Sequence, residues 1–134
     1  SRFGDGEMTK ILFVGLEPET VDFSDPALPP GLSAEKIHAG INVVMRRMTE
    51  LGWDADLCLL RPDDTAGPTL ESKLATHPYD CVVIGAGIRL PPKALMLFEA
   101  LINVVHKAAP GASIAFNSRP EDTADAVMRA LKGN

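Results

Sequence analysis

The chain has 134 residues, of which 46% are hydrophobic, and its formal net charge is −5. This length and composition are those of one globular domain with a core of its own. The acidic balance, without a basic run interleaved with aromatic side chains, excludes nucleic acid as an expected partner. No apolar run reaches the ~20 residues that cross a bilayer and no signal peptide is evident, so we expect no membrane partner and a cytoplasmic location.

Residues 1–7 precede Met8, and the apolar pattern begins almost directly after it. We interpret these seven residues as a remnant of expression and expect a single domain over residues 8–134.

Cys58 and Cys81 both fall within predicted strands, where a cysteine usually behaves as a small buried hydrophobe. Two such cysteines form neither a disulfide framework nor a zinc ligand set, so no metal is expected.

Four segments have the pattern of strands in a parallel sheet. Unbroken apolar runs are typical of strands that are buried on both faces, and residues 10–15 and 81–84 have this pattern. Residues 53–60 begin with polar and apolar residues in alternation, which predicts an edge strand. A further strand is predicted over residues 112–116.

A helical pattern follows each predicted strand. The predicted helices cover residues 34–51, 68–76, 92–108 and 118–131. Ser33 is the expected N-cap of the first helix, and Ser118 with Glu121 fits the S-x-x-E capping box at the start of the last. Apolar residues span about half of the circumference of helix 92–108, which indicates contact with a neighbouring helix or a surface for self-association.

The repeated strand–helix order predicts an α/β three-layer sandwich, with helices on both faces of a four-stranded parallel sheet. Right-handed crossovers give the strand order 2-1-3-4 and place helices 34–51 and 118–131 on the same face. This arrangement resembles a flavodoxin-like, Rossmann-like domain shortened by one strand. The resemblance begins at about Met8 and concerns the fold alone, so it implies where a ligand would bind and not which function the domain has.

In open parallel sheets a ligand binds outside the carboxyl ends of the strands, where the connections diverge. The candidate ligand-binding residues at this edge are Gly15, Gly85, Gly87, Arg89, Asn117, Ser118 and Arg119. Glycine lets the backbone approach a ligand, helix N-termini offer free N–H groups, and arginines complete an anion site. The proline-rich residues 16–32 are expected to form an ordered flap over the same edge.

Several families that share this fold are disfavoured by individual residues. Residues 15–20 contain one hydroxyl and two carboxylates, which would repel the phosphate of flavin mononucleotide. Gly85 stands where receiver domains carry the phospho-accepting aspartate. The Cys-x5-Arg loop of low-molecular-weight phosphatases, the cobalamin motif, the dinucleotide fingerprint, the P-loop and the G-x-S-x-G elbow are all missing from the sequence. No cofactor is therefore expected.

Three functions stay open at this point. The first is a binding or regulatory domain that holds a small anionic ligand at the carboxyl edge of the sheet. The second is a small hydrolase or transferase that uses His38 with Glu17 or Asp22, because a carboxylate beside an imidazole can activate water. The third is a protein-interaction module, acting through helix 92–108 or through the edge strand, and this reading includes a homodimer.

Overall fold

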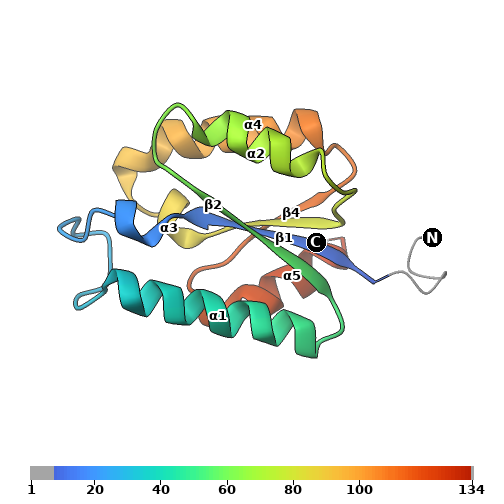
Figure 1. Cartoon of the computed structure of the whole chain (residues 1–134), viewed down its shortest axis with the longest axis horizontal. Helices are drawn as coiled ribbons and strands as arrows, with labels where there is room; N and C mark the ends of the chain where they lie inside the picture. Colours follow the sequence, from blue (N-terminus) through green and yellow to red (C-terminus); the bar gives the residue numbers. More distant parts are fainter. Residues whose placement is uncertain (1–7, 134) are drawn as a thin grey trace.

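The computed structural model describes residues 8–133 of the chain. In this part a single parallel sheet has the strand order β2-β1-β3-β4, and helices cover both of its faces (Figure 1). The strands are β1 (Lys10–Leu16), β2 (Asp54–Leu60), β3 (Cys81–Ile84) and β4 (Ser113–Phe116). The α/β class, the parallel sheet and the strand order predicted from the sequence are confirmed. Residues 1–7, interpreted above as a remnant of expression, lie outside the described residues.

The helices form the two outer layers. They are α1 (Ala34–Glu50), α2 (Ala66–Leu74), α3 (Ala86–Arg89), α4 (Leu95–Ala108) and α5 (Thr123–Leu131), with short 3-10 turns η2 (Pro18–Thr20), η3 (Pro92–Ala94) and η4 (Pro120–Asp122). Figure 1 shows α1 and α5 on one face of the sheet and α2 and α4 on the other, as predicted. None of these helices is both long and apolar enough to pass through a membrane.

The central strand β1 explains why both layers are needed. Side chains alternate between the two faces of a strand. Ile11 and Phe13 belong to the core under α1 and α5, whereas Leu12 and Val14 belong to the core under α2 and α4. All four side chains are buried. Burial of apolar surface on both faces is the main term that stabilises this sheet.

Helix α1 begins and ends where the sequence predicts. The Ser33 hydroxyl accepts a hydrogen bond from the backbone N–H of Lys36 at 3.2 Å, as expected of an N-cap. Gly52 follows the helix with a φ of 83°, a left-handed conformation that glycine adopts without steric cost. Between these two ends the helix presents one apolar stripe, in which Ile41 and Met48 are buried against the sheet.

The helix predicted over residues 92–108 begins later than expected. Gly85 is directly followed by the one-turn helix α3, then by the 3-10 turn η3, and α4 starts only at Leu95. Proline has no N–H and disfavours a helical conformation in the residue before it, so Pro91 and Pro92 separate the two helices. The predicted glycine turn is thus the start of a short helix that packs through Ile88, which is fully buried.

The predicted capping box of Ser118 and Glu121 is wrong. The acceptor is the Asp122 carboxylate, which receives the backbone N–H of Ser118 at 2.9 Å and that of Arg119 at 3.3 Å. Pro120 supplies no N–H and starts the 3-10 turn η4, which moves the beginning of α5 to Thr123. The carboxylate that closes the turn therefore lies one residue later than the motif predicts.

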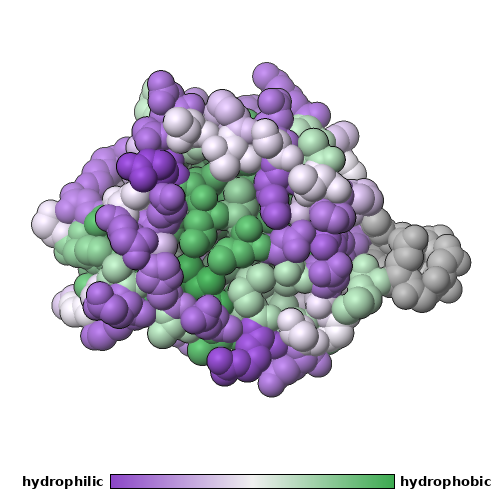
Figure 2. All heavy atoms as spheres, in the orientation of Figure 1, coloured by the Kyte–Doolittle hydropathy of each residue, from purple (hydrophilic) through white to green (hydrophobic). Residues whose placement is uncertain are grey.

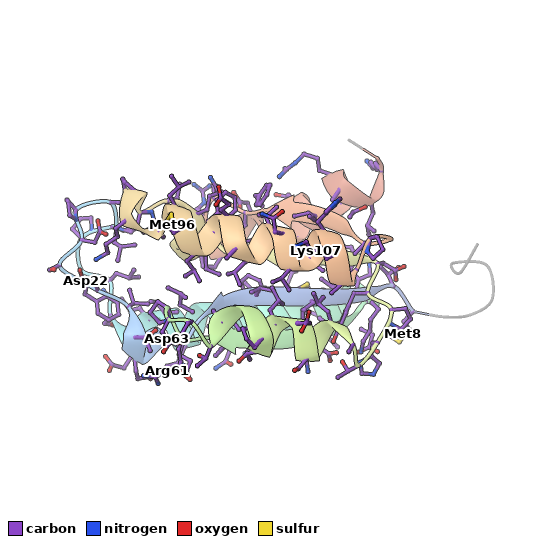
Figure 3. All side chains as sticks on the ribbon, turned by 90° about the horizontal axis from the view of Figure 1, so that it is seen from above. Met8, Asp22, Arg61, Asp63, Met96 and Lys107 are labelled. Atoms are coloured by element: carbon purple, nitrogen blue, oxygen red, sulfur yellow. The ribbon has the colours of Figure 1, made fainter. Side chains whose placement is uncertain are left out.

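The broad apolar face of α4 has a structural explanation. The helix packs against α2 as well as against the sheet, and Leu97, Phe98 and Ile102 are partly buried in the same core. Contact with a neighbouring helix, one of the two predicted explanations, is confirmed. Leu95 and Met96 remain exposed at the start of the helix, where Figure 3 labels Met96.

Candidate functional site

A cavity of about 740 Å³ lies at the carboxyl edge of the sheet. Its walls come from the flap (residues 16–32), from the strand exits at Gly15, Gly85 and Asn117, and from the first turns of α1. Asp22, which belongs to the flap, lies at the end of the molecule opposite Met8 (Figure 3). The flap is therefore ordered over the edge at which the sequence predicts a ligand.

Most of the predicted ligand-binding residues do come together. Those that line the cavity are Gly15, Gly85, Gly87, Asn117, Ser118 and Arg119. They arrive from three separate connections of the parallel sheet, which is the convergence expected at a switch point between strands. Arg89 is the predicted residue that does not line the cavity.

Asn117 holds the site together from a buried position. Its side-chain oxygen accepts the backbone N–H of Ala86 at 2.8 Å, and its amide donates to the hydroxyl of Thr123 at 2.9 Å. The side chain therefore links the exit of β4 to the start of α3 and to the start of α5. Because the side-chain oxygen and one N–H of the amide serve the fold, we assign Asn117 to positioning of the cavity wall.

Arg89 has a related role. Its guanidinium donates to the backbone carbonyl of Asn117 at 2.7 Å and lies 5.7 Å from the centre of the Phe116 ring. The Nε atom is buried and has no hydrogen-bond partner among the described residues. The sequence predicts that Arg89 binds an anion. In the structure its guanidinium instead ties β4 to α3, and the residue does not line the cavity.

Three cationic side chains line the cavity: Lys36, Lys93 and Arg119. The two lysines were not predicted from the sequence. The Lys36 ammonium donates to the carbonyl of Gly31 at 2.8 Å, and no carboxylate of residues 8–133 lies within ion-pair distance of it. Arg119 lies 3.5 Å from the Glu121 carboxylate. The sequence could have indicated Lys36 as a cavity residue, because it lies in the first turn of a helix that starts at the ligand edge.

Lys93 connects the flap to the turn η3. Its ammonium forms an ion pair with Asp22 and lies 3.5 Å from the carboxylate of Asp25. Hydrogen bonds from Lys93 and from Ser24 lower the pKa of Asp22 to about 2. Asp22 and Lys93 both line the cavity, so this contact ties the flap to η3 at the cavity wall.

In the predicted acid–base site, His38 pairs with neither Glu17 nor Asp22. His38 hydrogen-bonds Glu19 at 2.7 Å, and both side chains are exposed. The carboxylate of Glu17 lies 3.5 Å from Arg61, and Asp22 is held by Lys93. Of these residues only Asp22 lines the cavity.

Neither the cysteine thiols nor a group of metal-ligating side chains forms a second site in the part of the chain that the structure describes. Cys58 and Cys81 are buried and free, and burial raises the pKa of Cys81 to about 12. A thiol of this kind is inert as a nucleophile. Within residues 8–133, no three side chains of histidine, cysteine, aspartate or glutamate are grouped as metal ligands.

A polar network lies at the opposite, amino-terminal edge. The Lys10 ammonium lies 2.9 Å from Asp54 and 3.1 Å from Asp56. The Tyr79 hydroxyl donates to Asp56 at 2.6 Å, and burial together with this bond raises the pKa of Tyr79 to about 12. These contacts join the starts of β1 and β2 to the loop before β3, and the network is far from the cavity.

Comparison with known proteins adds no family assignment, since no protein-family model and no curated protein sequence matches the chain. The class of protein rests on the topology. The chain is a small parallel α/β domain with four strands in the order 2-1-3-4, an arrangement consistent with the flavodoxin-like fold.

Proposed function

We propose that this domain binds a small organic anion at the carboxyl edge of its sheet, in a binding or regulatory role. The observation that carries the proposal is the cavity of about 740 Å³ beneath the flap. Sites for small molecules have volumes of about 300–1,000 Å³ and are lined mainly by apolar side chains with a few polar groups. A bare inorganic anion would leave most of this volume unfilled.

The apolar part of the ligand is inferred from the cavity walls. Leu16 from β1, Val21 and Leu28 from the flap and Leu97 from α4 all face the cavity, and each is half-buried. Contact with an apolar body would remove this remaining exposed surface from water, at roughly 25 cal/mol per Å². The walls therefore favour a ligand with a hydrocarbon or aromatic portion.

The anionic part is inferred from the cations. Lys36 extends from the first turn of α1, and the N-terminus of this helix also favours negative charge. Arg119, which precedes α5, also lines the cavity, and 70% of its side chain is exposed. A carboxylate or phosphate between the two would receive charge-assisted hydrogen bonds. Lys93 is already neutralised by Asp22 and Asp25, so we assign it to closure of the flap.

Isothermal titration calorimetry with phenyl phosphate, benzyl alcohol and inorganic phosphate tests the proposal. We expect phenyl phosphate to bind most tightly, because it alone uses both the apolar walls and the cations. Lys36→Gln and Arg119→Gln should each weaken phenyl phosphate by about tenfold, the effect of one charge-assisted hydrogen bond. They should leave benzyl alcohol unchanged.

Lys107→Gln is the matched control, because Lys107 is an exposed lysine near the far end of α4 (Figure 3). Identical isotherms for all four proteins would contradict the assignment of the cations. Equal affinity for phenyl phosphate and for inorganic phosphate would show that the apolar walls are not used.

A further inference from the structure

Within residues 8–133, the backbone hydrogen-bonding groups along the outer edge of β2 have no partner. Within the described chain β2 pairs with β1 alone. The backbone N–H of Asp54 donates to Thr9 at 2.8 Å, and the carbonyl of Leu60 accepts from Glu17 at 2.7 Å, so even-numbered residues of β2 face β1. Successive residues of a parallel strand bond in opposite directions. The N–H and C=O groups of Ala55, Leu57 and Leu59 therefore point away from the sheet.

The edge of β2 lacks several of the features that usually protect an edge strand. Natural sheets blunt their edges with charged side chains, above all lysine, and with proline, bulges or very short strands. β2 has 7 residues, contains neither lysine nor proline, and has its charges, Asp54 and Asp56, only in its first half. Figure 2 shows a hydrophobic band on this face of the molecule, over β2 and between α1 and α2.

The other edge strand, β4, differs from β2 in its length and in the bonding of its outward backbone groups. β4 has 4 residues. Its outward-facing carbonyl at Phe116 accepts a hydrogen bond from the Arg129 guanidinium at 3.1 Å. Of the two edges, β2 is therefore the one that is prepared to receive another strand.

We propose that β2 is a homodimer interface, in which the β2 strands of two copies pair antiparallel across a twofold axis. Such pairing would satisfy the outward backbone groups and extend the sheet through both subunits. A twofold axis makes the interface isologous, so the same strand must be complementary to itself.

Charge makes β2 complementary to itself in this orientation. Asp54 is the first residue of the strand and Arg61 follows its last, and their side chains are 51% and 60% exposed. Within one copy Asp54 pairs with Lys10 at 2.9 Å, and Arg61 lies 3.5 Å from Glu17 and from Asp63. Antiparallel pairing brings the Asp54 end of each copy beside the Arg61 end of the other. At each end of the interface, Asp54 of one copy would then contact Arg61 of the other, in addition to the partners within its own copy. This self-complementarity favours a second copy of the chain over an unrelated partner strand.

Sedimentation velocity over a concentration series measures the dimer. Asp54→Arg and Arg61→Asp each place like charges together at both ends of the interface. Each should raise the dissociation constant of the dimer by roughly tenfold, because like-charge contacts oppose association. The double variant restores opposite charges and should recover the wild-type constant. Glu99→Arg, an equivalent reversal beside β4, should have no effect.

Ala55→Pro supplies an independent variant. It removes only an outward N–H, and proline is tolerated on an edge strand in that position. This variant should remain folded by circular dichroism and should be monomeric.

Amide hydrogen exchange gives a readout for individual residues. In the wild-type protein, exchange at Ala55, Leu57 and Leu59 should slow as concentration rises, whereas the amides that bond to β1 stay protected throughout. A wild-type protein that is monomeric at every concentration would overturn the proposal. So would a dimer that resists Ala55→Pro, a dimer disrupted by Glu99→Arg, or a double charge reversal that restores nothing.

Discussion

The side-chain oxygen of Asn117 accepts the backbone N–H of Ala86 at 2.8 Å and thereby joins the ends of two neighbouring strands. β3 and β4 pair in register up to Ile84 and Phe116, after which the chains diverge. Asn117 spans this divergence, and only 3% of it is exposed. One buried amide thus fixes the geometry of the edge where the cavity lies.

Replacement of Asn117 should destabilise the fold. Asn117→Ala leaves the Ala86 N–H and the Thr123 hydroxyl without this partner, and we expect the free energy of unfolding to fall by about 1–3 kcal/mol. Urea denaturation monitored by circular dichroism measures the change. Asn103→Ala is the control, because Asn103 is exposed on α4, and its loss should cost less than about 0.5 kcal/mol. Equal effects of the two substitutions would contradict this role.

Gly85 and Gly87 should respond differently to the same substitution. A Cβ atom at Gly85 would lie 3.2 Å from the carbonyl oxygen of Val14, whereas a Cβ at Gly87 would meet nothing within 4 Å. We therefore expect Gly85→Ala to lower the free energy of unfolding by about 1 kcal/mol or more, through overpacking against backbone. Gly87→Ala should be neutral or slightly stabilising. Thermal denaturation of the two variants side by side decides the matter.

The ion pair between Lys93 and Asp22 should give the flap a dependence on acid pH. Since the pKa of Asp22 is lowered from 3.8 to about 2, the stabilising contact is present above pH 3.8 and is lost as the pH falls toward 2. Carboxyl NMR titration should show this low pKa in the wild-type protein and a higher value in Lys93→Gln, still below 3.8 because the hydrogen bonds from Ser24 remain.

Limited proteolysis at neutral pH should then cut the flap of Lys93→Gln faster than that of the wild type. The exposed lysine variant Lys107→Gln serves as the control and should be cut at the wild-type rate. An unchanged Asp22 titration in Lys93→Gln would show that the two side chains do not interact in solution.

Tyr79 should couple stability to alkaline pH. Its pKa is raised from 10.0 to about 12, so the contribution of its hydrogen bond to Asp56 is complete below pH 10 and is lost as the pH rises toward 12. Tyr79 is the single tyrosine of the chain, and its ionisation can be followed directly by ultraviolet absorbance. Tyr79→Phe should lower the free energy of unfolding by about 1–2 kcal/mol at neutral pH. A titration midpoint near 10 would contradict the buried hydrogen bond.

The amino-acid sequence by itself determined the fold of this protein. The unbroken apolar runs at residues 10–15 and 81–84 marked the inner strands, and Ser33 and Gly52 marked the ends of α1. The order of the strands then followed from right-handed crossovers. These signals are local, because hydrophobic periodicity and capping depend on residues only a few positions apart.

The sequence also located the edge where the cavity lies, but it assigned some side chains wrongly. Ser118 and Glu121 matched a capping motif that Asp122 completes instead, because Pro120 shifts the turn by one residue. Arg89 was expected to face a ligand and instead bonds the carbonyl of Asn117. Motif spacing cannot tell these alternatives apart, because each residue has several polar groups within reach.

Only the tertiary structure decided which distant residues meet. Lys93 and Asp22 are 71 positions apart, and Asn117 and Ala86 are 31 apart. Which of them come within hydrogen-bond distance depends on the twist of the sheet, on where each helix starts and on how the flap packs. These quantities arise from the packing of the whole chain, and no local pattern of residues contains them.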